Sequence, residues 1–205
     1  MRASRFDQRG NYLQSFGAEQ PVFLPGDVEG VVRTLAPARG GGVWSVPALR
    51  SYQLERWSAD GRLERRLVRS PAWFPAVTTQ ELSLDRTPAP YVTSLAEDGA
   101  GRLWVLSLLA DRRWKSALRQ VGTGETRRWE IDDQDRFRDT MLEVVDPVAG
   151  RVVTRVRLEE PWNWVTEDGH LLRVTERDDG AWMIAVHRAV LVGADARGTS
   201  PPERR

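Results

Sequence analysis

Apolar and polar residues alternate along most of this chain, in short runs that end at turns containing glycine. The clearest pair of runs, in residues 91–105, flanks a turn with two glycines, and a second pair, in residues 141–158, flanks Gly150. Alternation with a period of two is typical of half-buried strands, and turns of this composition are typical of β-hairpins. Residues 91–158 therefore predict four strands, interrupted by a polar insert at about 109–140.

The same plan recurs on both sides of this unit. Residues 5–16 predict a lone hairpin around Gly10, residues 28–68 predict four strands with Gly61 in the outer hairpin, and residues 162–188 predict three strands. The matching turn glycines are separated by about one period of ~40–50 residues, or by one period plus the insert. Spacing of this kind indicates that one structural unit is repeated.

Four-stranded antiparallel units at this period are typical of a β-propeller. A β-sandwich also has many short strands, but it would not place the same turn at the same point of each unit. We therefore predict an all-β fold, an incomplete β-propeller of four-stranded antiparallel blades with about three blades plus a hairpin. Residues 1–192 would form this partial propeller domain, and residues 193–205 would form a disordered tail.

Three local details accompany this plan. Residues 63–68 predict an outer strand whose charged side chains protect an exposed edge. Trp73 and Phe74, in the proline-rich loop at 70–90, are expected to pack on a neighbouring sheet. Residues 117–131 predict a weak hairpin inside the insert.

Residues 98–105, Asp-Gly-Ala-Gly-Arg-Leu-Trp-Val, resemble the blade motif of NHL-like, six-bladed TolB-like and related bacterial propellers. Residues 6–13 and 145–152 resemble the outer hairpins of the same group. The resemblance covers most of residues 5–192. It implies that the chain is the C-terminal half of a six-bladed propeller whose start is lost upstream. Members of this group are often secreted, and others are binding scaffolds, sensor domains, or metal-dependent lyases and lactonases.

Composition limits the function classes. The 30 basic and 29 acidic residues give a net charge of +1, which leaves no charge footprint for nucleic acid or an anionic membrane. The chain has no cysteine, which excludes disulfides, thiolate catalysis and cysteine-based metal sites. No run approaches the ~20 apolar residues of a membrane helix, and the N-terminus lacks the apolar core of a secretion signal. The sequence does not indicate the cellular compartment. We expect an extracytoplasmic location if an upstream segment is missing.

Few residues suggest catalysis. The two histidines, His170 and His187, fall short of the three protein ligands of a catalytic zinc, and His170 is expected to be a partly exposed turn residue. The acidic run at 132–135 lacks the glycine and the terminal glutamate of a calcium loop, and it predicts a solvated acidic loop. We therefore expect no catalytic residue, no metal ligand and no cofactor.

Tryptophans occupy matched strand positions, which predicts packing between blades and not a platform for sugars. These tryptophans are Trp44, Trp104, Trp164 and Trp182. A binding face would be built from residues in turns and in the insert. The candidate binding-face residues are Glu97, Asp98, Trp114, Asp168 and His170.

The leading functional hypothesis is a non-enzymatic propeller scaffold that binds a protein or a small ligand through loops at one face. One alternative is an enzyme of the NHL-type lyase or lactonase kind, which would need His, Asp or Glu side chains from several blades around a metal on the propeller axis. Another is the sensory propeller of a larger signalling protein. The identity of the protein or ligand that it binds is left open. Binding of nucleic acid and insertion into a membrane are not expected. Self-association through open blade edges is expected.

The incomplete strand count generates a prediction about stability. A blade is stabilised by neighbours on both sides, so an open arc exposes apolar positions such as Phe6, Leu13, Trp164 and Ile184. We expect the isolated chain to be poorly stable or to self-associate, and extension of the gene upstream to rescue it. Sedimentation and thermal unfolding test this, and a compact monomer with a sharp, cooperative transition would contradict it.

Overall fold

The computed structural model describes residues 3–6, 9–16, 32–47, 51–75, 82–177 and 179–192. These residues form an all-β structure in which antiparallel strands gather into several sheets. Among them, the one α-helix is the short α1 (Gln134–Phe137). The all-β prediction is therefore confirmed, and so are four-stranded antiparallel units.

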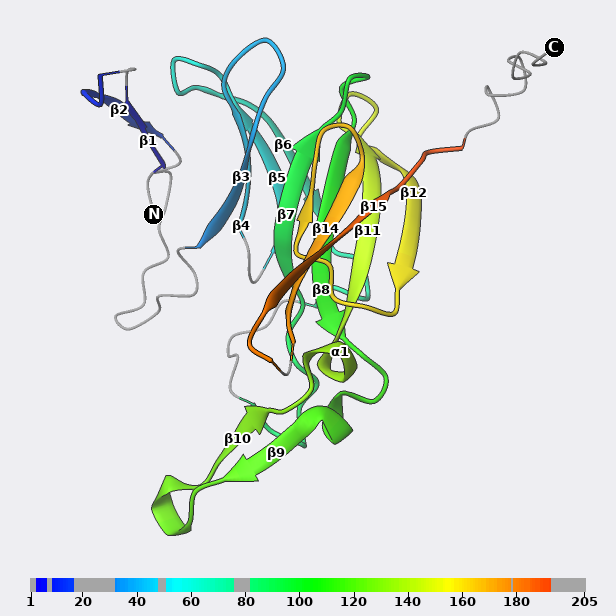
Figure 1. Ribbon diagram of the computed structural model, residues 1–205. Helices are drawn as coiled ribbons and strands as arrows, with labels where there is room; N and C mark the ends of the chain where they lie inside the picture. The colour runs from blue at the N-terminus through cyan, green and yellow to red at the C-terminus, as the bar shows by residue number, and fades with distance from the viewer. Residues whose placement is uncertain are drawn as a thin grey trace, which may run out of the picture.

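Three sheets make up the body of the molecule (Figure 1). The first sheet contains β3 (Arg33–Pro37), β4 (Val43–Pro47), β5 (Tyr52–Trp57) and β6 (Leu63–Arg69) in spatial order. The central sheet has the order β7 (Tyr91–Glu97), β8 (Leu103–Ala110), β11 (Arg138–Asp146) and β12 (Arg151–Leu158). The third sheet has the order β13 (Trp164–Val165), β14 (His170–Glu176) and β15 (Trp182–Arg188).

Two hairpins form sheets of their own. The first joins β1 (Ala3–Phe6) to β2 (Tyr12–Phe16), and the second joins β9 (Leu118–Val121) to β10 (Arg128–Ile131). Both hairpins were expected from the sequence. The second lies in the insert, which Figure 1 shows at the opposite end of the central sheet from the turns that follow β7 and β11. The predicted tail at 193–205 lies outside the described residues.

The central sheet is covered on both faces. Along β8, Leu103 and Val105 belong to the buried cluster shared with the first sheet. The alternate residues Trp104 and Leu106 belong to the cluster shared with the third sheet. Because both faces of β8 are buried, its sequence is apolar apart from Ser107 and does not alternate. The three sheets therefore form a stack with two hydrophobic layers.

Aromatic side chains fill the layer between the first and central sheets. Tyr52 packs edge-on against Trp73 and Phe74, with ring centroids 5.6 and 5.4 Å away. Phe74 is buried and Trp73 is partly buried against the same cluster. The expectation that the loop after β6 packs on a neighbouring sheet is confirmed.

A buried carboxylate sits at the edge of this layer. Glu143 on β11 is fully buried, and it accepts hydrogen bonds from Arg69 of the first sheet and from Arg155 of β12, the latter at 2.6 Å. Burial and the nearby charge of Glu143 raise the pKa of the Tyr52 phenol well above its ordinary value. The hydrogen bond from Arg69 crosses from the first sheet to the central sheet, so Glu143 helps to fix the position of one sheet on the other.

The tryptophan prediction is correct for two residues and wrong for two. Trp44 and Trp104 are buried between sheets, but Trp164 and Trp182 are 50% and 68% exposed. The exposed pair lies on the face of the third sheet that points away from the central sheet, where no described layer covers it. Ile184 on the same face is also exposed.

The acidic run at 132–135 lies at the surface as predicted, with Asp132 and Asp135 both 57% exposed, and it is ordered by local bonds. The side chain of Asp133 accepts hydrogen bonds from the backbone N–H groups of Asp135 and Arg136 and caps α1. Asp132 is paired with Arg119 at 2.9 Å, so the exposed run also has fixed partners. The side chains of Phe6 and Leu13, two of the residues expected to be exposed, lie outside the described residues.

Loss of the buried charge at Glu143 should weaken the stack. We expect Glu143→Gln to lower the free energy of unfolding by about 2 kcal/mol, because the partly exposed Arg69 and Arg155 lose their charge-assisted hydrogen bonds to a buried anion. Glu130→Gln, which removes the exposed pair with Arg128, is the matched control and should cost less than about 1 kcal/mol. Urea unfolding of the three proteins measures both, and equal costs would contradict the assignment.

Candidate functional site

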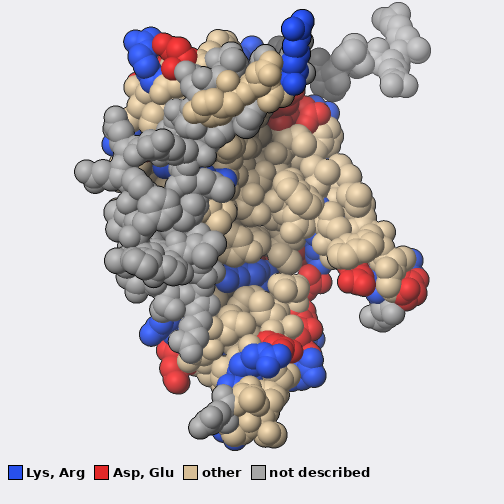
Figure 2. All heavy atoms as spheres, turned by 90° about the vertical axis from the view of Figure 1, so that its left-hand side faces the viewer, with Lys and Arg blue, Asp and Glu red and all other residues tan. Residues whose placement is uncertain are grey.

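The first strands of the three sheets run side by side in the same direction. Thr34 of β3 bonds to Val92 of β7, and Arg39 after β3 bonds to Glu97 at the end of β7. Thr93 bonds to Asn163, and Ser94 bonds to Val165 of β13. In both pairs the residue numbers rise together, so the strands are parallel. The turns that follow these strands must therefore lie at one end of the stack, which we call the turn end. It is at the top of Figure 1. In Figure 2 charged side chains lie at the top and over the lower half of the molecule, and a largely uncharged surface separates the two groups.

Turns of one design recur in the described part of the chain. The N–H of the first residue bonds to the carbonyl four residues later, and a glycine three residues later donates back to the first carbonyl. That glycine has a positive φ of 77–97° in each turn, which side chains rarely adopt. The turns begin at Ala38, Ser58, Asp98, Thr166 and Arg177.

Asp98 braces the turn between β7 and β8. Its carboxylate accepts hydrogen bonds from the Ala100 and Arg102 backbone N–H groups, from the Arg102 guanidinium and from the Trp104 indole, at 2.8–3.0 Å. Burial acts to raise the pKa of Asp98, but these hydrogen bonds outweigh it and lower the pKa below its ordinary value. Asp98 is therefore an ionised structural anchor that has little accessible surface of its own.

Glu97 joins the central sheet to the first sheet at the turn end. One of its carboxylate oxygens accepts hydrogen bonds from the Trp44 indole and from the Arg39 backbone N–H, both at 2.8 Å. The Arg39 side chain also donates to the Asp98 carbonyl at 3.4 Å. These contacts hold the turns of the two sheets together and form one wall of a pocket.

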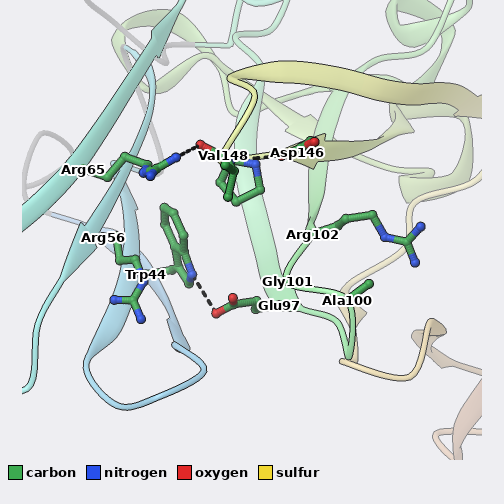
Figure 3. Close-up of a pocket in the computed structure, with 10 residues that line it drawn as sticks. Trp44, Arg56, Arg65, Glu97, Ala100, Gly101, Arg102, Asp146 and Val148 are labelled. Carbon is green, nitrogen blue, oxygen red and sulfur yellow. Dashed lines mark hydrogen bonds between the residues drawn. The ribbon is translucent and has the colours of Figure 1, made fainter.

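The pocket lies between the first and central sheets and encloses about 470 Å³. Three arginines line it, Arg56 from β5, Arg65 from β6 and Arg102 from the β7–β8 turn. In Figure 3 the Arg65 side chain points across the pocket toward Val148, whereas the Arg102 side chain extends away from the other lining residues. The full lining is Trp44, Arg56, Arg65, Glu97, Ala100, Gly101, Arg102, Asp146, Pro147 and Val148. Its volume is in the range of small-molecule sites.

The carboxylates of the pocket are already bonded. Asp146 accepts from the Ala149 and Val148 backbone N–H groups, and these bonds lower the pKa of its carboxyl. Arg65 bonds to the Pro147 carbonyl across the pocket, and Arg56 bonds to Glu64 and to a backbone carbonyl. A guanidinium has five N–H donors, so these bonds leave each arginine with donors to spare. The site therefore offers positive charge and unused donors to a ligand.

Asp168 lies in the β13–β14 turn and His170 begins β14, at the same end but outside the lining of this pocket. The Asp168 carboxylate is 2.9 Å from Nδ1 of His170. The hydrogen bond from the Thr166 hydroxyl, followed by that from His170, lowers the pKa of Asp168 to about 2. Both side chains are accessible to solvent, as expected for turn residues.

Trp114 is not part of this face. It lies in a 3-10 helix of the insert, at the other end of the central sheet, and it is buried with Ala117 and Phe137 in a small core. The ammonium of Lys115 lies 5.6 Å from the centre of its ring. Of the five candidate residues, the structure brings Glu97 into the pocket, places Asp98 beside it, and separates the other three from it.

The sequence interpretation missed the three arginines. It assigned the charges at 63–68 to protection of an edge. The period of two nevertheless places Arg65 on the same face as Leu67, which packs against the buried cluster. Arg102 directly follows a turn glycine, which was a second signal. The presence of these side chains in one pocket could not be read from the sequence, because their elements are far apart along the chain.

A second polar cluster lies at the base of the insert. Asp111 and Asp139 are both buried, and Asp139 pairs with Arg157. Burial raises the pKa of Asp139 and outweighs the effect of Arg157, and the neighbouring Asp111 adds to the rise. The two carboxyls titrate as a pair, at the opposite end from the pocket.

Neither a metal cluster nor a membrane helix was found in the described residues. No three His, Asp or Glu side chains among them lie close enough together to hold a metal ion. No helix in the same residues has the length and hydrophobicity needed to cross a membrane. No family model matches the chain, and neither a curated protein nor a solved structure matches it.

The role of Asp98 generates a pH prediction. Because its pKa is lowered in the folded protein, its stabilisation is present above the unfolded pKa of about 4 and is lost as pH falls through the folded pKa. We expect Asp98→Asn to cost about 2 kcal/mol at pH 7, and the difference from wild type to shrink in acid. Thermal unfolding from pH 7 to pH 2 measures it. Asp85→Asn, an exposed control, should cost little at any pH, and a pH-independent loss in Asp98→Asn would refute the charge effect.

Proposed function

We propose that this protein is a non-enzymatic binding scaffold built as an arc of β-propeller blades. The three stacked sheets would be successive blades, with β3, β7 and β13 as inner strands. The same-direction alignment of these strands supports the arrangement, since inner strands of propeller blades run together around the axis. The turn design shared by the described blades supports it too.

The outer hairpins give further support. The hairpins β1–β2, β5–β6 and β11–β12 each contain a register shift just before the turn, at Arg5/Phe6, Arg56/Trp57 and Val144/Val145. A bulge at the same place in three hairpins is expected of a repeated unit, because bulges are fixed features of a fold. This agrees with the proposed kinship to NHL-like and TolB-like propellers.

The function that the site supports best is binding of a small ligand that carries a carboxylate or phosphate group. The single observation that carries this proposal is that three arginines, Arg56, Arg65 and Arg102, line one pocket. Arginine pairs with both anions through two parallel N–H donors. The nearby carboxylates are held by backbone and indole donors, so they would not fill the site.

Calorimetry with citrate and with inorganic phosphate tests the proposal and separates the two anion classes. We expect one of them to bind, and Arg56→Gln combined with Arg65→Gln to weaken binding by at least about 10-fold, since two charge-assisted contacts are lost. Arg119→Gln, which changes an exposed arginine in the insert, should bind like wild type. Absence of binding by both anions, or equal affinity in the double variant, would refute the proposal.

A further inference from the structure

We propose that β15 pairs with β15 of a second copy of this chain, antiparallel and about a two-fold axis at Ala185. The third sheets of the two copies would then join into one continuous six-stranded sheet. The inference is independent of the ligand pocket, which lies between the first and central sheets.

The open edge of β15 lacks the usual protection. Among the described residues β15 is hydrogen-bonded to β14 alone, with an unbroken register. Residues 182–187 contain no charged residue other than a histidine and no proline. The outer strands of the other two sheets are different, because β6 and β12 each carry several arginines. Charge and proline are the common means of preventing edge pairing, so β15 is the strand suited to pairing.

The backbone of β15 has groups directed toward the open edge. Ala189 donates its N–H to the Gly169 carbonyl at 2.9 Å, which makes these two residues a hydrogen-bonded pair. Hydrogen-bonded pairs recur at every second residue of an antiparallel ladder, and Ala185 is four residues from Ala189. Ala185 therefore directs its backbone N–H and C=O groups toward β14. The N–H and C=O groups of Ile184 and Val186 therefore point outward, where a second strand can reach them.

The side chains of β15 are complementary to those of the same strand reversed. With the two-fold axis at Ala185, Ile184 lies opposite Val186 of the second copy, and Trp182 lies opposite Arg188. The first is an apolar cross-strand pair and the second is a cation–π pair, and each occurs twice. This register places residues whose backbone N–H and C=O groups point outward opposite one another, and it pairs every residue from Trp182 to Arg188.

The exposed surface fits an apolar contact. Trp182, Ile184 and Val186 are 68%, 62% and 55% exposed on one face of the sheet. In the paired sheet their neighbours would be the same side chains of the second copy. Glu176 lies beside Trp182 in the register of β14 with β15. Across the paired strands, Trp182 would therefore lie between the Glu176 carboxylate of its own copy and Arg188 of the second copy. This charge order favours the antiparallel arrangement over a parallel one.

Two variants at one position separate edge pairing from stacking of sheet faces. Ile184→Pro removes an outward N–H without removing a bond to β14, and it should weaken dimerisation by at least about 30-fold. Ile184→Lys keeps the backbone donor and loses only the two side-chain pairs with Val186, so it should weaken dimerisation by about 10-fold, less than Ile184→Pro. Sedimentation equilibrium of the full chain measures both. A monomeric wild type, or a dimer lost in Ile184→Lys and kept in Ile184→Pro, would overturn the proposal.

A cross-linking experiment tests the register even if Ile184→Pro fails to fold. The chain has no cysteine, so Ala185→Cys introduces a single thiol. In the proposed dimer the two Cα atoms at this position would be about 4.5 Å apart, which allows a disulfide. We expect Ala185→Cys to form a disulfide-linked dimer on mild oxidation, and the exposed control Val190→Cys to form far less. Equal cross-linking by both variants would overturn the register.

Discussion

The fold depends on the burial of both faces of β8. Its alternate side chains supply one hydrophobic layer to the first sheet and another to the third. A strand of this kind cannot be stable in a two-layer structure, because one apolar face would meet water. The flanking sheets, and the turns that they bring to one end, are therefore consequences of this strand. Trp104 links the layer to the turn, because its indole bonds to Asp98.

Buried charge distinguishes the two outer faces of the stack. On the first sheet, Glu55 is almost fully buried and pairs with Arg33 and Arg66 at 2.9 and 3.0 Å. The corresponding face of the third sheet presents tryptophan, isoleucine and valine. A buried ion pair requires partners in a fixed geometry, whereas an apolar face accepts any surface of matching shape. The outer face of the first sheet and the outer face of the third sheet are thus chemically different and would not pair with each other.

The strands could be predicted from the sequence because their signals are local. Alternation with a period of two and a glycine at each turn depend on neighbours within one hairpin, as at Gly61. The exposure of Trp164 could not be predicted, because it depends on whether another layer covers the third sheet. The pocket could not be predicted either, since Arg65 and Pro147 meet across 82 positions of the chain. Glu97 could be predicted as a binding-face residue because it lies beside a turn that its glycines mark in the sequence.

The insert between β8 and β11 has a consequence for labelling the molecule. Its small core holds Trp114, and the only lysine of the chain, Lys115, lies over that ring. A reagent that acylates side-chain amines therefore has one lysine to modify, at the end away from the arginine pocket. A fluorophore attached there would sit beside an indole that can quench it. Its emission would report on the packing of the insert while leaving the guanidinium groups untouched.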